Sequence, residues 1–363
     1  MENLLRRAQQ QRQANLPFVL YHKPQSDEVI GFFQKDNHLY QVADFTESGF
    51  VFASFDGSKK YLIPEIAAEV LAAPFVSKTI NSKGSHFSMV SEQDEEFFQN
   101  LVHAGVTEIR EGVLEKVVLS RAEIISVNDF NLLEVFEKLI NLYPATCVYC
   151  FYHPQVGLWM GATPEQLLQI RGTTFETIAL AGTQKATGVE VISWGLKEQE
   201  EQQFVTDFLV AKLKPVAENL VVTPPFSIQA GEIWHIKTVV SGQLGPATKI
   251  QDLVNLLHPT PAVCGLPTTA AKQFIVENEN YDRQFYTGFL GELNVTFGEE
   301  RKDSDLFVNL RCMQIDIQQG VQQDKLDVQV QLYMGCGVTK DSNPEKEWEE
   351  SVNKSSTMKK VFS

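Results

Sequence analysis

The sequence lacks the segments that would place a protein in or across a membrane. No apolar run approaches the roughly 18 residues that a transmembrane helix requires. The first residues, MENLLRRAQQQRQ, have no apolar centre of the kind found in secretory signal peptides. We therefore expect a cytoplasmic protein that does not bind in a membrane.

Positive charge is also scarce. The 363 residues include 31 Lys and Arg against 46 Asp and Glu, which gives a net charge of −15 and a pI near 5.0. No block rich in Lys or Arg is present to focus a positive field, which argues against nucleic acid or an anionic membrane as a partner. An anionic substrate would therefore need a site that is locally positive against the charge of the whole chain.

Cysteines are few, and their pattern predicts no disulfide framework. The five cysteines are scattered, and only Cys147 and Cys150 have the CxxC spacing of redox or metal motifs. That pair lies in the strand-like run ATCVYCFYH, without a second CxxC pair elsewhere. We interpret both residues as buried thiols.

Repeats, low-complexity tracts and long linkers are absent, so we expect a single domain over 1–363. Helical patterns occupy 93–105, 129–142, 196–213, 249–257, 268–277 and 344–360. Apolar runs bounded by turn residues predict strands at VIGFFQ, HLYQVADF, KVVLSRAEIISV, TCVYCFYH, GLWMGA, LLQIRG, TFETIALAG, HIKTVVSGQL, YTGFLGELNVTFG, LFVNLRCMQIDI and KLDVQVQLYMGCGV. The strands cluster without a regular βαβ alternation, which favours an α+β fold with antiparallel sheets.

The stretch NPEKEWEESVNK, residues 343–354, predicts a helix with an unusual polar face. Asn343 can accept hydrogen bonds from the first-turn amides, and Pro344 suits the first helical position. At 3.6 residues per turn, one face carries Glu347, Glu350, Ser351 and Lys354. Taken alone, these acids could simply favour the helix dipole and pair with the lysine.

A second helix, from Lys197 to Leu213, also turns two acids inward. With about 100° per residue, Glu198 and Glu201 fall on the same side as the apolar Phe204. Carboxylates three residues apart on an inward face repel one another and resist desolvation, so they need a cation. Two inward ExxE pairs suit a hard divalent ion such as Mg²⁺, although the same pattern is common on solvated helices.

Nine motifs follow one another in the chain: EKVVLSR (115–121), GATPEQLL (161–168), ALAGT (179–183), KEQEEQ (197–202), LHPTPAVCGLP (257–267), FYTGFLGE (285–292), LFVNLRC (306–312), GCGV (335–338) and EWEESVNK (347–354). Their order and content resemble the chorismate-utilising enzymes, which include isochorismate synthases, salicylate synthases and the large chains of anthranilate and aminodeoxychorismate synthases. The resemblance covers roughly residues 100–360. It implies a single α+β domain of two stacked antiparallel β-sheets flanked by helices. Residues 1–95 would complete the sheets, and 96–363 would form the chorismate-binding catalytic core.

Two positions indicate which branch of the family the chain resembles. In isochorismate and salicylate synthases a lysine at the place of Lys116 is the general base for water that attacks ring carbon 2, and the ammonia-using branches lack it. Ala181 supports the same branch, because aminodeoxychorismate synthases carry a nucleophilic lysine there. The resemblance therefore implies a water-using enzyme with no amidotransferase subunit.

The resemblance also implies the acid–base pair. Lys116 would take a proton from the attacking water, and Glu165 would give one to the hydroxyl that leaves ring carbon 4. Such a pair works only when the lysine is partly neutral and the glutamate partly protonated near neutral pH.

Chorismate carries two carboxylates, and the resemblance supplies groups to hold them. Arg311 and Tyr286 would bind the enolpyruvyl carboxylate, since planar carboxylates favour arginine. A magnesium ion assisted by Lys354 would bind the ring carboxylate. The complete substrate-binding set is Gly182, Thr183, His258, Tyr286, Arg311, Gly335, Cys336, Gly337 and Lys354, and the metal ligands are Glu198, Glu201, Glu347 and Glu350. For His258, a purely structural hydrogen-bonded role stays open.

We therefore expect a magnesium-dependent isochorismate synthase that feeds menaquinone or a catechol siderophore and acts as a monomer. A salicylate synthase, which uses the same residues and then eliminates pyruvate, is the alternative. A chorismate-binding relative without activity would require the loss of a catalytic or metal-ligating residue. The chain departs from the family pattern at Gln184, where many relatives have arginine, and at Gln202, where histidine is usual.

Overall fold

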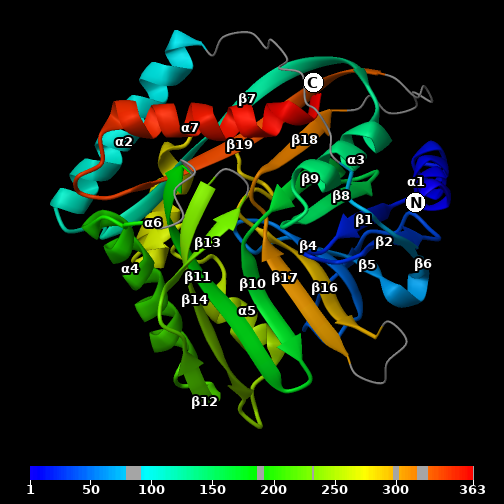
Figure 1. Cartoon of the computed structure of the whole chain (residues 1–363), viewed down its shortest axis with the longest axis horizontal. Helices are drawn as coiled ribbons and strands as arrows, with labels where there is room; N and C mark the ends of the chain where they lie inside the picture. Colours follow the sequence, from blue (N-terminus) through cyan, green and yellow to red (C-terminus); the bar gives the residue numbers. More distant parts are fainter. Residues whose placement is uncertain (79–90, 186–191, 231–232, 297–301, 317–325, 363) are drawn as a thin grey trace.

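The computed structural model describes residues 1–78, 91–185, 192–230, 233–296, 302–316 and 326–362. Helices and strands alternate irregularly along the chain, and the strands form two antiparallel sheets (Figure 1). The predicted α+β class is therefore confirmed. No helix in these ranges is long and apolar enough to cross a membrane.

The first sheet contains nine described strands. Their order is β15 (Gly265–Leu266), β7 (Lys116–Phe130), β19 (Leu326–Val338), β18 (Cys312–Asp316), β9 (Gly157–Thr163), β8 (Cys147–His153), β1 (Phe18–His22), β2 (Glu28–Gln34) and β6 (Ala68–Pro74). The longest pairing joins β7 to β19, and its register places Val118 opposite Gly337 and Ser120 opposite Gly335.

The second sheet contains ten strands in the described ranges. Their order is β12 (Ala217–Val222), β14 (Ile233–Leu244), β11 (Thr174–Lys185), β10 (Gln166–Arg171), β17 (Asp303–Val308), β16 (Phe289–Val295), β4 (Gly49–Ala53), β5 (Lys60–Pro64) and β3 (Tyr40–Gln41), with β13 (Phe226–Ala230) paired to β14. The N-terminal strands thus extend both sheets, since β1, β2 and β6 join the first and β3, β4 and β5 join the second.

Helices cover the outer faces of the sheets. They are α1 (Glu2–Gln13), α2 (Glu92–Arg110), α3 (Leu132–Leu142), α4 (Leu196–Leu213), α5 (Ile250–Leu257), α6 (Thr268–Asn278) and α7 (Pro344–Lys359), with short 3-10 turns η1 (Glu65–Ala67) and η2 (Lys360–Phe362). One apolar cluster packs α1 and α3 on the first sheet, and a second packs α4 and α5 on the other. A third joins α2, α6 and α7 to β7 and β19, and Figure 1 shows α7 running beside α2 across those strands.

An aromatic core separates the two sheets. It includes Phe32 and Trp159 from the first sheet and Phe52 from the second, all fully buried. The rings of Phe52 and Trp159 lie 6.0 Å apart in an edge contact. Pairs of this kind stabilise a core by about 0.5–1.5 kcal/mol beyond the area that they bury.

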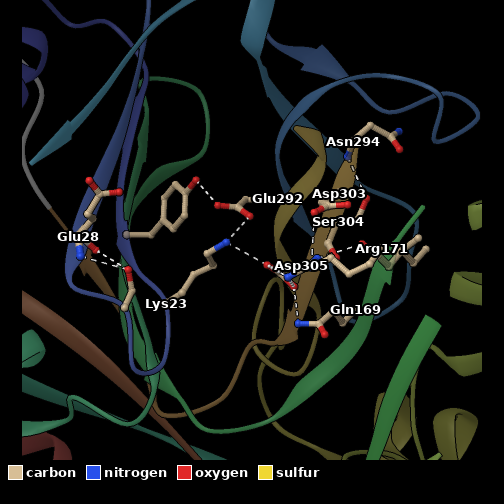
Figure 2. Close-up of polar contacts among 12 residues, drawn as sticks. Lys23, Glu28, Gln169, Arg171, Glu292, Asn294, Asp303, Ser304 and Asp305 are labelled. Carbon is tan, nitrogen blue, oxygen red and sulfur yellow. Dashed lines mark hydrogen bonds and ion pairs between the residues drawn. The ribbon is translucent and has the colours of Figure 1, made fainter. Parts of the chain in front are cut away.

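A network of charged and polar side chains also connects the sheets (Figure 2). Lys23, which follows β1, donates to Glu292 at 2.8 Å and to Asp305 at 3.0 Å. Arg171 on β10 donates to both carboxylate oxygens of Asp305 at 2.8 Å. Tyr21 on β1 donates to Glu292 at 2.6 Å. The network therefore links the N-terminal strands to the centre of the second sheet.

The predicted helix signals are confirmed, and several strand predictions need correction. Asn343 accepts a hydrogen bond from the amide of Lys346 at 2.9 Å, and Pro344 opens α7 as expected. The predicted strand LFVNLRCMQIDI is wrong as one element, because its halves are β17 and β18 in different sheets. In HLYQVADF only Tyr40–Gln41 is a strand. The sequence patterns did not predict α1, β1, β4, β5, β6, β12, β13 or β15.

Candidate active site

A cavity of about 220 Å³ lies where β7 and β19 of the first sheet face β11 and β14 of the second. Helices α4 and α7 and several loops complete its wall. The predicted residues that line it are Lys116, Glu165, Gly182, Glu198, Glu201, Tyr286, Arg311, Gly335, Gly337, Glu350 and Lys354. Side chains that are remote in the sequence therefore meet in one space.

Two chain crossings carry Glu165 and Arg311 into the cavity. Glu165 lies between β9 and β10, where the chain passes from the first sheet to the second. Arg311 lies between β17 and β18, where the chain returns. The crossings are tied by the amide of Val308, which donates to the Glu165 carbonyl at 2.9 Å, and by the amide of Ala162, which donates to the Arg311 carbonyl at 3.1 Å. The two side chains are thus held in adjacent segments.

Burial changes the acidity of Glu165. The residue is 6% exposed, and desolvation raises the pKa of its carboxyl to about 7, although the charge of Lys116 acts in the opposite direction. A carboxyl group with this pKa is partly protonated at neutral pH, as a general acid must be. Burial in the cavity therefore favours the partly protonated carboxyl that a general-acid role for Glu165 would need.

Lys116 enters the cavity from the first position of β7. Its Nζ atom lies 3.7 Å from Oε1 of Glu201 on α4, and its side chain is buried. Gly337 on β19 makes room for both groups, since a Cβ atom there would lie 2.9 Å from Glu201 Oε1 and 3.3 Å from Lys116 Cε. At Gly335 a Cβ atom would lie 2.6 Å from the Tyr286 hydroxyl. These glycines therefore admit neighbouring side chains to the cavity.

Helix α7 contributes an ion pair to the mouth of the cavity. Lys354 Nζ lies 2.7 Å from Oε1 of Glu350, one turn earlier, and donates to the carbonyl of Gly335 at 2.8 Å. Burial works against the charge of Lys354, but the Glu350 carboxylate outweighs it and raises the pKa of the ammonium. Lys354 therefore remains a cation throughout the physiological range.

A second cation comes from Arg311, which lies beside an aromatic wall. Its backbone has a φ of 46°, a left-handed conformation that is uncommon for a residue with a side chain. Burial lowers the pKa of Arg311, yet arginine keeps its proton in proteins. The ring of Tyr286, on the same cavity wall, stacks on Tyr333 with 5.3 Å between centroids. Arg311 and Lys354 thus bring two cations to a cavity that the carboxylates of Glu198, Glu201 and Glu350 also line.

His235, which the sequence patterns did not single out, also lines the cavity. Its Nδ1 atom lies 3.1 Å from the carbonyl of Gly182, and its buried Nε2 atom has no hydrogen-bond partner among the described residues. Burial, followed by the charge of Arg311, lowers the pKa of His235 to about 4. The neutral ring donates through Nδ1 to Gly182, which leaves the Nε2 lone pair as an acceptor for a bound molecule.

The donor set on α7 suits a hard divalent cation. Carboxylate oxygens of Glu347 and Glu350 lie within 4.8 Å of one another and of the Cys336 thiol. Glu198 and Glu201 line the same cavity as Glu350, from α4. Magnesium prefers such oxygen donors to a thiol, and burial raises the pKa of Cys336, which keeps it protonated. The carboxylates thus fit the magnesium that was expected from the two ExxE pairs.

Of the remaining predicted site residues, Cys336, Glu347 and His258 do not line the cavity. Cys336 packs in the apolar cluster under α2 and α7, and its thiol donates to the Glu347 carbonyl at 3.3 Å. Glu347 lies on the buried face of α7 and is 4% exposed. The Nε2 atom of His258 lies 3.2 Å from the Ser54 carbonyl and 3.1 Å from that of Phe55, which favours its structural role. The side chain of Thr183 lies outside the described part of the chain.

Two further sequence features have a structural outcome. All five cysteines are buried and free, which confirms the interpretation of Cys147 and Cys150 as buried thiols. Gln202, which replaces the usual histidine, donates to the hydroxyls of Thr206 at 2.8 Å and Thr238 at 2.6 Å. Its amide therefore fixes α4 to β14.

A two-sheet α+β fold whose enclosed cavity is lined by a buried acid, an amine and two further cations is the architecture of a small-molecule enzyme. The chain belongs to the chorismate binding enzyme family, which it matches over residues 58–363. This match confirms the resemblance and extends it toward the N-terminus, into β5.

Relatives of known name share the family and the fold. The chain is 29% identical to the isochorismate synthase DhbC of Bacillus subtilis (strain 168) over 293 residues, which cover 75% of this chain and 69% of that protein. It is 32% identical to the isochorismate synthase EntC of Escherichia coli (strain K12) over 263 residues, or 69% of this chain and 62% of that protein. The structure of MenF, the menaquinone-specific isochorismate synthase from Escherichia coli, superposes with a TM-score of 0.77 at 22% identity and covers 96% of this chain and 89% of that one. The predicted pair of antiparallel sheets flanked by helices is thereby confirmed.

Proposed function

We propose that the chain is an isochorismate synthase, which adds water to ring carbon 2 of chorismate and releases the hydroxyl from ring carbon 4. The observation that carries the proposal is that Lys116 and Glu165 line one cavity with the two cations Arg311 and Lys354. A dicarboxylate substrate needs both cations, and the exchange of hydroxyls needs both proton carriers.

Each proton transfer has one residue. Lys116 would take a proton from the water that bonds to carbon 2. Glu165, protonated because burial raises its pKa to about 7, gives a proton to the oxygen that leaves carbon 4. In the net reaction one water adds its hydroxyl to carbon 2 and the hydroxyl of carbon 4 leaves as a second water, so the molecular formula is unchanged.

The substrate carboxylates define the orientation of the ring. Arg311 and the Tyr286 hydroxyl, which both line the cavity, would bind the enolpyruvyl carboxylate, and Lys354 would bind the ring carboxylate. The free lone pair of His235 Nε2 would accept a hydrogen bond from a substrate hydroxyl. We extend the proposal to this histidine because its ring is held by Gly182 on the same wall.

Magnesium is the proposed cofactor. Glu350 and Glu201 would be its principal ligands, with Glu198 and Glu347 as direct or water-mediated ligands. When bound, the ion supplies positive charge to the ring carboxylate. The similarity to siderophore and menaquinone relatives supports isochorismate as the precursor of one of these products.

Product analysis tests the proposal. The purified chain is incubated with chorismate and Mg²⁺, and the products are separated by chromatography and identified by mass and absorbance. We expect isochorismate. Salicylate together with pyruvate would instead identify a salicylate synthase, and unchanged chorismate would contradict both functions.

A further inference from the structure

A buried arginine stands directly behind the cavity wall without lining the cavity itself. Arg283 is 3% exposed and lies between α6 and β16. Its guanidinium carbon is 4.7 Å from the ring centroid of Phe55 and 5.7 Å from that of Tyr286. An arginine in such a place must satisfy its charge and its donors within the protein.

All five N–H donors of Arg283 have an acceptor. Nε donates to Oε2 of Glu279 at 2.7 Å and Nη2 to Oε1 at 2.5 Å, which makes a bidentate ion pair. Nη2 also donates to the Val118 carbonyl at 2.7 Å. Nη1 donates to the Val263 carbonyl at 3.0 Å and to the Thr287 hydroxyl at 3.2 Å. Val118, Val263 and Thr287 all line the cavity, so one side chain holds three separate parts of its wall.

Glu279 and Thr287 extend these contacts along the chain. Oε1 of Glu279 accepts from both the amide and the hydroxyl of Ser120 at 2.8 Å, and Ser120 lies four residues after Lys116 in β7. The Thr287 hydroxyl donates to the Tyr286 carbonyl at 2.6 Å. Thr287 has a φ of 60°, a conformation that a β-branched residue rarely adopts and that the surrounding contacts must hold.

We propose that Arg283 and Glu279 are positioning residues that fix the strand bearing Lys116 relative to the turn bearing Tyr286. The inference deepens the proposed function and rests on it. The pair sets the separation between the base and the group that binds the enolpyruvyl carboxylate. Neither Arg283 nor Glu279 lines the cavity, so neither contacts the substrate itself. A lysine cannot take this role, because it has three donors on a flexible stem and no planar fork.

Arg283→Lys tests the inference, with Arg171→Lys as the matched control. Arg171 also pairs with a buried carboxylate, that of Asp305, whose two oxygens both accept from Nη2 (Figure 2). Arg171 does not line the cavity. Both variants keep a positive charge and lose a planar fork. The melting temperature, the chorismate affinity by calorimetry, and kcat and KM are measured for each variant, well below both melting temperatures.

We expect both variants to melt earlier than the wild-type chain. Arg283→Lys should lower kcat at least tenfold and raise KM at least threefold, because both the base and the clamp lose their relative position. Arg171→Lys should stay within twofold of wild type in both constants. A folded Arg283→Lys with constants as close to wild type as those of the control would overturn the inference.

Thr287→Val provides a second test if Arg283→Lys does not fold. It keeps the shape of the side chain and removes the hydroxyl that joins Arg283 to the Tyr286 carbonyl. We expect a lower melting temperature, because a buried Nη1 donor of Arg283 loses its acceptor, and a kcat/KM at least threefold lower well below that temperature. Wild-type constants would refute the positioning role. A wild-type chain that makes no isochorismate would instead reject the proposed function, so the two failures are distinguishable.

Discussion

Lys116 and Glu201 approach each other across Gly337, with 3.7 Å between Nζ and Oε1. The contact joins the first residue of β7 to the second turn of α4, and it forms only because β19 carries no side chain at that point. The proposed base and a proposed metal ligand therefore share one interaction. A substitution at any one of Lys116, Glu201 and Gly337 should therefore shift the side chains at the other positions.

Replacement of Lys116 by alanine should remove the base and leave the fold intact. We expect kcat for isochorismate formation to fall at least about 100-fold, which is the usual lower range for a group in acid–base catalysis. Chorismate should still bind, because Arg311 and Lys354 are unchanged. Steady-state kinetics and calorimetry check both points. Near-normal turnover would remove Lys116 from the mechanism.

Gly337→Ala should disturb the same contact from the opposite side. The new Cβ would meet the far ends of two flexible side chains, at 2.9 Å and 3.3 Å, so those side chains move and the backbone stays. We expect a loss of at least tenfold in kcat with a nearly unchanged melting temperature. Gly288→Ala is the contrasting variant, because its Cβ would lie 1.9 Å from the Ala53 carbonyl and should prevent normal folding. Equal effects of the two variants on stability would contradict this explanation.

Glu165→Gln should change how stability depends on pH. A folded-state pKa of about 7, above the ordinary 4.5, means that the folded chain binds this proton more tightly than the unfolded chain. The contribution of Glu165 to stability is therefore fully present below pH 4.5 and is lost as the pH rises through about 7. Denaturant unfolding should show that, between pH 5 and pH 8, the free energy of unfolding of the variant rises relative to that of wild type by up to about 3 kcal/mol. A constant difference would show that Glu165 has an ordinary pKa.

His235→Asn should separate the two nitrogens of the histidine. The asparagine amide can still donate to the Gly182 carbonyl, as Nδ1 does, but it has no acceptor in the place of Nε2. We expect KM for chorismate to rise several-fold with the melting temperature preserved. An unchanged KM would show that the Nε2 lone pair does not meet the substrate.

Glu350→Gln should weaken magnesium binding. The substitution removes one anionic oxygen from the cluster of Glu347 and Glu350 and also breaks the ion pair with Lys354. Calorimetric titration of the metal-free chain with Mg²⁺ should give a dissociation constant at least tenfold higher than that of wild type. Chelation of the metal from the wild-type chain should likewise weaken chorismate binding. Binding that is indifferent to metal would reject this ligand assignment.

The helix signals could be predicted because they depend on local chemistry. Asn343 and Pro344 begin α7 through backbone groups of the first turn, and the apolar periodicity of α3 and α5 is short-range. The crossing at Arg311 could not be predicted in this way. LFVNLRCMQIDI is a continuous apolar run, and its break between two sheets depends on partners far away in the chain. The family resemblance correctly identified Arg311 as a cavity residue. It did so from the motif LFVNLRC, and strand periodicity alone could not have shown it.

His235 and Arg283 escaped prediction for a related reason. The sequence does not distinguish a histidine with an unpartnered nitrogen from one that is fully bonded, and Arg283 lies in the polar run NYDRQ, which is typical of a surface loop. The proposed positioning role of Arg283 depends on five acceptor atoms that come from four separate parts of the chain. Only the assembled fold brings them together.

Conversion of chorismate in H₂¹⁸O tests the central claim most directly. Water is the proposed source of the new hydroxyl on carbon 2, and Lys116 is proposed to activate it. Mass spectrometry of the isochorismate formed at early times should show one ¹⁸O atom per molecule, and Lys116→Ala should form this product at least about 100-fold more slowly. Unlabelled isochorismate, or labelled product formed at an undiminished rate by the variant, would contradict the proposed reaction.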